Sequence, residues 1–157
     1  MRKNLLALSI AAMVGGLTAG AANAAVIVGT STATGLAIAN NGVGHTLLVP
    51  YFSTQGTNKT LLNIVNTDTV NGKAVKLRYR GASNSDDLFD ITIYLSPGDM
   101  WTGGIVADEA TGRSKMITAD TSCTLPPVVN GELFPTDRLP SSKTDAQKAS
   151  MTREGYI

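Results

Sequence analysis

The side chains that could perform chemistry are few and lie far apart in the chain. His45 is the single histidine and Cys123 the single cysteine among 157 residues. A nucleophilic triad needs a His beside its Ser or Cys, and a structural zinc site needs four Cys or His ligands. His45 lies in a Gly-rich segment, distant in sequence from Cys123. The sequence therefore predicts a protein that is not an enzyme and that binds no cofactor or metal.

A short acidic stretch, "NSDDLFD", offers the oxygen ligands that calcium prefers. Its candidates are Asn84, Asp86, Asp87 and Asp90. The stretch lacks the central Gly and the distal Glu of an EF-hand loop. Two other interpretations are open: an acidic turn that caps a strand, and cross-strand pairing with the cationic row that contains Arg78 and Arg80. We expect the acidic turn.

The stretch "DITIYLSPGDMWTGGIV", residues 90–106, carries the single tryptophan of the chain. If Met100 continues the inward row of side chains, Trp101 points outward. An exposed pair of Tyr94 and Trp101 would stack a sugar ring or contact a peptide or partner domain. The favoured interpretation is that Trp101 covers the end of a sandwich core. The glycines of residues 102–104 predict a β-bulge beside Trp101 rather than a phosphate loop.

Cys123 is an odd cysteine, which in an exported protein indicates a missing partner or a free thiol. We expect a disulfide with a cysteine beyond Ile157; a reactive thiol is the alternative. The final residues "REGYI" look like the start of a strand. The fold is therefore expected to be incomplete at its C-terminus, with an exposed sheet edge that invites dimerisation or aggregation.

The first 24 residues are typical of a secretory signal peptide. Arg2 and Lys3 precede an apolar run, and Ala22-Asn23-Ala24 fits a cleavage site. An uncleaved N-terminal anchor is the alternative. Cleavage leaves 157 − 24 = 133 residues with 11 basic and 12 acidic side chains, a net charge of −1. We expect an exported protein, at the cell surface or extracellular, with no nucleic-acid partner and no membrane span in the mature chain.

Several short alternating segments separated by turns predict an all-β, antiparallel, immunoglobulin-like β-sandwich. We expect an irregular lead-in over residues 25–44, the sandwich over residues 45–121, and a Pro-rich loop over residues 122–157 with a helical turn near residues 144–149. Pro50 places its strand at an edge or beside a bulge. The expected core consists of alternating residues from three strands: Leu62, Ile64, Val75, Leu77, Phe89, Ile91, Ile93 and Leu95.

Three local patterns lead to further expectations. Residues 60–68 carry apolar side chains on both faces, including Leu61 and Val65, which is typical of a strand buried partly on both faces. Asn71-Gly72 is a strong signal for a two-residue turn. Pro97-Gly98 predicts a turn in which Gly98 takes a positive φ.

Two resemblances extend this picture. The order of "LLNIVNTD", "AVKLRYRG" and "LFDITIYLSPGDMWTGGIV" resembles the strands of immunoglobulin-like surface modules, in which Leu-x-Pro-Gly-acidic ends one strand and the chain crosses to the other sheet. The stretches "GHTLLVPYFST", "TLLNIVNTD", "GKAVKLRYRGASNSDDLFD", "YLSPGDMWTGGI", "SCTLP" and "TREGYI", over about residues 44–157, resemble a family of secreted, cell-surface proteins of proteobacteria whose members are largely uncharacterised. The resemblance implies export and a β-rich fold, brings no catalytic residues, and implies a longer chain.

Two functional hypotheses follow. The first is a non-catalytic exported β-sandwich protein with a structural or adhesive role, which contacts a protein or glycan at a surface. The second is a sugar- or peptide-binding module that uses Tyr94 and Trp101.

Overall fold

The computed structural model describes residue 39 and residues 41–157. The predicted signal peptide, residues 1–24, and most of the predicted lead-in lie outside the described residues. The chain divides into two units, Met1–Leu47 and Leu48–Ile157. In the first unit the described residues contain no strand or helix, and residues 41–47 are exposed. The second unit contains all the elements discussed below.

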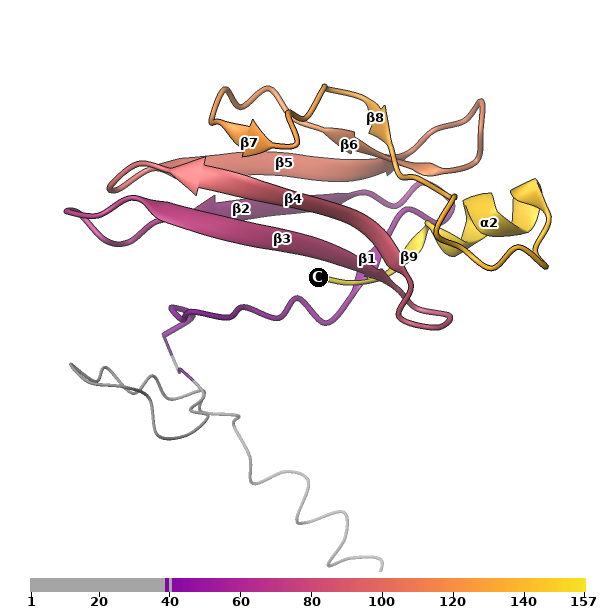
Figure 1. The fold of residues 1–157 in the computed structure, drawn as a ribbon, viewed down its shortest axis with the longest axis horizontal. Helices are drawn as coiled ribbons and strands as arrows, with labels where there is room; N and C mark the ends of the chain where they lie inside the picture. Colours follow the sequence, from indigo (N-terminus) through magenta and orange to yellow (C-terminus); the bar gives the residue numbers. More distant parts are fainter. Residues whose placement is uncertain (1–38, 40) are drawn as a thin grey trace, which may run out of the picture. The chain divides into compact units, whose positions relative to one another are not determined.

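The second unit is built from two antiparallel sheets (Figure 1). One sheet has five strands in the order β1-β9-β3-β4-β7, and the other has four in the order β2-β5-β6-β8. The strands are β1 (Phe52–Ser53), β2 (Thr60–Val65), β3 (Lys73–Gly81), β4 (Asp87–Leu95), β5 (Met100–Ala107), β6 (Ser114–Ile117), β7 (Thr124–Leu125), β8 (Glu132–Leu133) and β9 (Glu154–Tyr156), with one helix, α2 (Asp145–Met151). The predicted all-β, antiparallel sandwich is confirmed, whereas its immunoglobulin-like identity stays a prediction.

The strict alternation in β4 sets the centre of the core. Phe89, Ile91, Ile93 and Leu95 are all buried, as predicted. On β3, Leu77 is also buried, and Val75 packs against the core. The two residues of β2 that were predicted for the core also face it. Ile64 is buried, and Leu62 packs against the core from a partly buried position.

The outward face of β3 and β4 carries the cross-strand charge pairing that the sequence left open as an alternative to the expected acidic turn. Arg78 lies opposite Asp90 in the ladder, with 3.7 Å between Nε and Oδ2. Lys76 reaches the same carboxylate oxygen at 3.5 Å. Asp87 instead pairs with Arg138, at 2.6 Å, from a segment that the sequence did not connect with it. Each exposed pair contributes only about 0–1 kcal/mol.

The chain turns a corner between β4 and β5, from one sheet to the other. Gly98 has φ +70°, and the Asp99 amide donates to the Ser96 carbonyl at 3.1 Å. Proline at the second position and a positive-φ glycine at the third define this tight turn. The predicted Pro97-Gly98 turn and the change of sheet are therefore confirmed.

Two expectations about β2 are wrong. The strand is not buried on both faces, because Leu61 is 75% and Val65 52% exposed on the outer side. The Asn71-Gly72 signal does not make a hairpin, because β2 and β3 belong to different sheets. Residues 66–72 therefore form a second crossover, which ends at the same corner as the β4–β5 turn.

The segment after residue 121 is part of the sandwich rather than an appended loop. It supplies β7 and β9 to one sheet and β8 to the other. Phe134 is fully buried and stacks on Phe89 with ring centroids 4.9 Å apart. The predicted boundary at residue 121 is therefore not a boundary in the structure. Single apolar residues between prolines fill the core here, without the periodicity that predicts a strand.

Two features of this segment agree with the sequence. The predicted helical turn near residues 144–149 is α2, whose N-terminus is capped reciprocally by Thr144 and Gln147. The predicted final strand is β9. It pairs with β1 on one side and β3 on the other, so it is an inner strand. Strand β1 lies at a sheet edge, but Pro50, on which the predicted edge position rested, precedes this strand.

Candidate functional site

Trp101 belongs to the core, and the exposed Tyr94–Trp101 pair that the sequence suggested does not exist. Trp101 is 1% exposed, whereas Met100 is 47% exposed, so the faces are opposite to those expected if Met100 continued the inward row. Tyr94 is 47% exposed on the outer side of the other sheet. The favoured interpretation, that Trp101 covers the core, fits its burial.

Gly103 makes room for the tryptophan ring. A Cβ atom on Gly103 would lie 2.3 Å from Cη2 of Trp101. The two residues are two positions apart and share one face of β5. The predicted bulge at residues 102–104 is wrong, because the ladder between β2 and β5 runs without interruption from Thr60↔Ile105 to Val65↔Met100. The glycines serve close packing instead.

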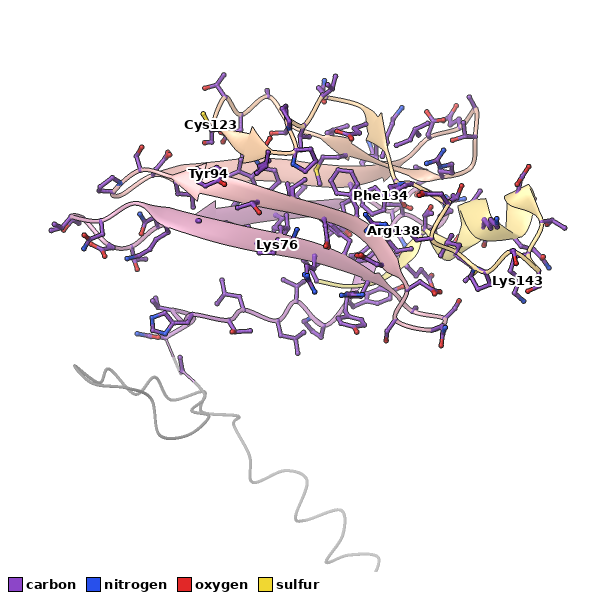
Figure 2. All side chains as sticks on the ribbon, viewed as in Figure 1. Lys76, Tyr94, Cys123, Phe134, Arg138 and Lys143 are labelled. Carbon is purple, nitrogen blue, oxygen red and sulfur yellow. The ribbon has the colours of Figure 1, made fainter. Side chains whose placement is uncertain are left out.

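Tyr94 and Cys123 lie side by side, although 29 positions separate their numbers in the chain. The Tyr94 amide donates to the Cys123 carbonyl at 2.9 Å, directly before β7 pairs with β4 (Figure 2). Cys123 is a free and exposed thiol. The disulfide predicted for it stays a prediction.

Two adjoining hollows surround the corner between the sheets, and we call them together the corner groove. One has a volume of about 630 Å³ and is lined in part by Tyr94 and Cys123. The other, of about 490 Å³, is lined in part by Met100 and Asp120. Both share Asp99, Thr121 and Ser122. Both are open depressions with short polar side chains at their walls.

The carboxylates of the corner groove are engaged in structural hydrogen bonds. Asp99 accepts from the Met100 amide at 2.8 Å and from the Ser96 amide at 3.3 Å. Asp120 accepts from the Thr102 amide at 2.9 Å and from the Ser122 hydroxyl at 2.6 Å. Partial burial alone would raise the pKa of Asp120, but the hydrogen bonds from Ser122 and Thr102 outweigh it and lower that pKa. These groups hold backbone in place.

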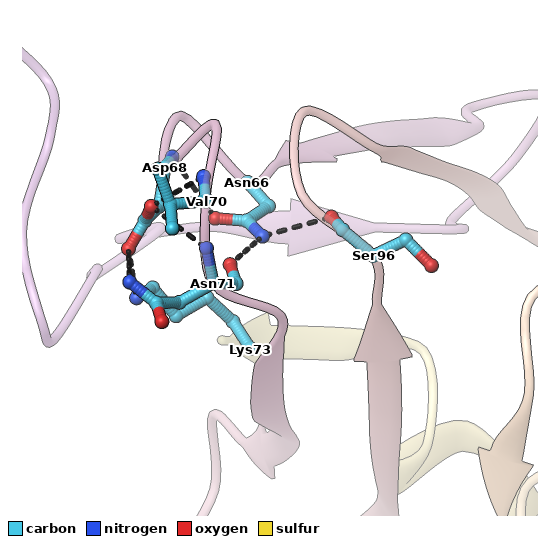
Figure 3. A network of polar contacts seen from close by, with 6 residues as sticks. All are labelled: Asn66, Asp68, Val70, Asn71, Lys73 and Ser96. Carbon is cyan, nitrogen blue, oxygen red and sulfur yellow. Dashed lines mark hydrogen bonds and ion pairs between the residues drawn. The ribbon is translucent and has the colours of Figure 1, made fainter.

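A buried amide fastens the two crossovers to each other (Figure 3). Asn66 is 4% exposed, and its Nδ2 donates to the Asn71 carbonyl at 2.9 Å and the Ser96 carbonyl at 2.8 Å. Its Oδ1 accepts from the Asp68 amide at 3.1 Å. One side chain thus makes hydrogen bonds to backbone groups of both loops. Its own buried polar atoms are satisfied by the same bonds, as burial requires.

Asp68 organises the outer part of the same corner. Its carboxylate accepts from Lys73 Nζ at 2.6 Å, and from the amides of Val70 at 2.9 Å and Asn71 at 3.0 Å. The Lys73 ammonium first, and then the amides of Asn71 and Val70, hold the pKa of Asp68 well below its ordinary value. The carboxylate therefore stays ionised below its ordinary pKa of 3.8.

The other chemical candidates form no site of their own among the described residues. His45 is exposed in the first unit. Within the described part of the chain, no three His, Cys, Asp or Glu side chains are placed to hold a metal ion. The acidic stretch forms ion pairs, as described for Asp87 and Asp90. Among residue 39 and residues 41–157, none of the helices has the length and apolar character needed to span a bilayer.

Comparison with protein-family models, with curated proteins and with solved structures gives no match.

Sequence reasoning found two of the groove residues and missed the others. It singled out Tyr94 and Cys123, but not that they are neighbours, because the pairing of β4 with β7 spans a long stretch of chain. It missed Asn66, Asp99 and Asp120. Each of them carries a sequence feature that indicates a role in a turn. It is a short polar side chain at a strand end, of the kind that bonds to backbone two or three residues away.

Proposed function

We propose that this protein is an exported, non-catalytic β-sandwich protein of the cell surface or extracellular space, with a structural or adhesive role. The observation that carries the proposal is how the corner groove is built. Its carboxylates, Asp99 and Asp120, are committed to backbone amides, and its exposed groups include an aromatic ring and a thiol. Such a surface favours contact with a partner over turnover of a substrate.

The N-terminal sequence supports the location. The basic pair, the apolar run and the Ala22-Asn23-Ala24 site together are the features that direct a chain out of the cytoplasm. The resemblance over about residues 44–157 to secreted surface proteins of proteobacteria points the same way.

Fractionation of a Gram-negative host that expresses the full chain tests the proposal. We expect a mature protein that begins at Ala25, recovered from the envelope or the medium. An Ala22→Leu/Ala24→Leu variant, which removes the small residues of the cleavage site, should keep its first 24 residues. Recovery of the uncleaved wild-type chain from the cytoplasm alone would overturn the proposal.

A second candidate function is sugar or peptide binding by Tyr94. The specific observation is that the Tyr94 ring is 47% exposed at a hollow of about 630 Å³. Trp101 takes no part, because it is buried. A glycan and peptide panel against wild-type protein, Tyr94→Ala, and the control Tyr51→Ala tests this function. Tyr51 is 59% exposed but does not line the groove. Binding that Tyr94→Ala leaves unchanged would exclude it.

A further inference from the structure

Strand β2 is an unusual edge of this sandwich. The other three strands at sheet edges, β1, β7 and β8, are each two residues long, whereas β2 has six. Short edges are one way in which proteins prevent edge-to-edge pairing; lysine, proline and bulges are others. The β2 sequence "TLLNIV" has no charge and no proline, and its ladder with β5 has no bulge. It is the long, unprotected edge among the described strands.

The ladder shows which backbone groups of β2 are free. The Asn66 amide donates to the Asp99 carbonyl at 2.8 Å, one step beyond the Val65↔Met100 pair. In antiparallel sheets, hydrogen-bonded and non-hydrogen-bonded pairs alternate. The even-numbered residues of β2 therefore bond to β5. The amides and carbonyls of Leu61, Asn63 and Val65 point away from β5, toward the open edge.

The same three residues carry the exposed side chains of the strand. Leu61 is 75% and Val65 52% exposed, and Met100, opposite Val65, is 47% exposed. Together they form an apolar strip on the outer face, with Asn63 between its two ends. Exposed Leu and Val beside unpaired backbone mark a position that another strand can cover.

This edge is complementary to itself. A two-fold axis through Asn63 places Asn63 opposite its own copy, Leu61 opposite the partner's Val65, and Leu62 opposite Ile64. All three pairings keep outward residues outward and inward residues inward, as a sheet requires. The odd-numbered residues of the two copies turn their free amides and carbonyls toward each other. Each pair of opposite residues therefore exchanges two hydrogen bonds.

The charges that flank β2 favour the antiparallel arrangement. Lys59 precedes the strand and is exposed, and Asp68 follows it. Antiparallel pairing brings the Lys59 end of one copy to the Asp68 end of the other, whereas parallel pairing would place like charges together. We propose that β2 pairs antiparallel with β2 of a second copy, centred on Asn63, and joins two four-stranded sheets into one continuous sheet across a symmetric dimer.

The mature full chain tests this by analytical ultracentrifugation over a concentration series. Leu61→Lys alone, or Val65→Glu alone, places a charge opposite an apolar residue. Each should raise the dimer dissociation constant at least about tenfold. The double variant Leu61→Lys/Val65→Glu places opposite charges across the interface and should regain dimer affinity to within about threefold of wild type. Val70→Lys, at an exposed position outside β2, is the matched control and should leave the constant unchanged.

Cross-linking tests the register independently. In a Cys123→Ser background, Asn63→Cys should form an intermolecular disulfide on oxidation, because paired residues there lie about 5.5 Å apart between Cα atoms. Val70→Cys in that background is the control and should form no intermolecular disulfide. A wild-type protein that is monomeric at every concentration would overturn the proposal. This holds equally if residues 25–38, or a strand of another protein, covers β2 instead. Failure of the double variant to regain affinity, together with no Asn63→Cys cross-link, would overturn this register.

Discussion

Substitution of Gly103 by alanine should destabilise the sandwich through the tryptophan ring. The new Cβ would lie 2.3 Å from Cη2 and 2.6 Å from Cζ2 of Trp101, whereas carbon atoms pack at about 3.5 Å or more. The ring must therefore move by about 1.2 Å, but Trp101 is 1% exposed and has no open space to enter. Overpacking of this kind costs about 1–3 kcal/mol. The smaller unfolded-state entropy of alanine offsets about 0.4–1 kcal/mol. We expect a net loss of about 1.3 kcal/mol in the free energy of unfolding.

Urea unfolding followed by far-ultraviolet circular dichroism measures this loss. A loss of that size should lower the melting temperature by about 5 °C. The control is Gly81→Ala, whose Cβ would have Leu88 side-chain atoms as its nearest neighbours, at 3.5 Å or more, and should be neutral or stabilising by up to about 1 kcal/mol. In a Trp101→Leu background, Gly103→Ala should cost at least about 1 kcal/mol less than in the wild type. A Gly103→Ala protein as stable as wild type, or additive effects in this cycle, would refute the packing argument.

Three further predictions concern the core and the corner. Ile93→Asp should prevent folding, because it buries an unpaired charge at a fully buried position, whereas Tyr94→Asp should remain soluble and cooperative; circular dichroism of both variants checks the face assignment. Asn66→Ala should cost about 1–3 kcal/mol, because it removes a buried side chain that bonds to the Asn71 and Ser96 carbonyls, while the exposed Asn58→Ala should be neutral; urea unfolding that finds the two equal would contradict this. Asp68 should stay ionised below its ordinary pKa of 3.8 in carboxyl-carbon NMR. Because the folded state lowers this pKa, the contribution of Asp68 to stability is present above pH 3.8 and is lost as the pH falls toward the folded-state pKa. Asp68→Asn should therefore flatten the fall in stability below pH 3.8.

The strands with a strict period of two were predictable from the sequence, since alternation alone fixes which side chains meet the core. The four inward residues of β4 are the clearest case. The face of Trp101 follows the same period. The buried residues stay odd-numbered across the Gly98 turn, from Leu95 to Trp101 and Ile105, so the assumption that Met100 points inward was the error. Gly103, two positions from Trp101, was the local signal for a buried ring.

The last 36 residues show a different limit of sequence reasoning. Phe134 and Leu139 are core residues, but Phe134 has only Leu133 as an apolar neighbour and Leu139 has none, so no period marks them. Their burial depends on long-range pairing of β7, β8 and β9 with strands much earlier in the chain. The corner groove depends on the same pairing, because it brings Cys123 to Tyr94.

The exposed thiol of Cys123 allows the most direct test of the proposed location. Intact cells that express the full chain are treated with a maleimide too large to cross the outer membrane, with and without an impermeant reductant; lysed cells give the total, and Cys123→Ser gives the background. A protein displayed at the surface predicts labelling of intact cells close to that of lysed cells, directly or after reduction. Labelling that appears only after lysis would contradict display at the surface.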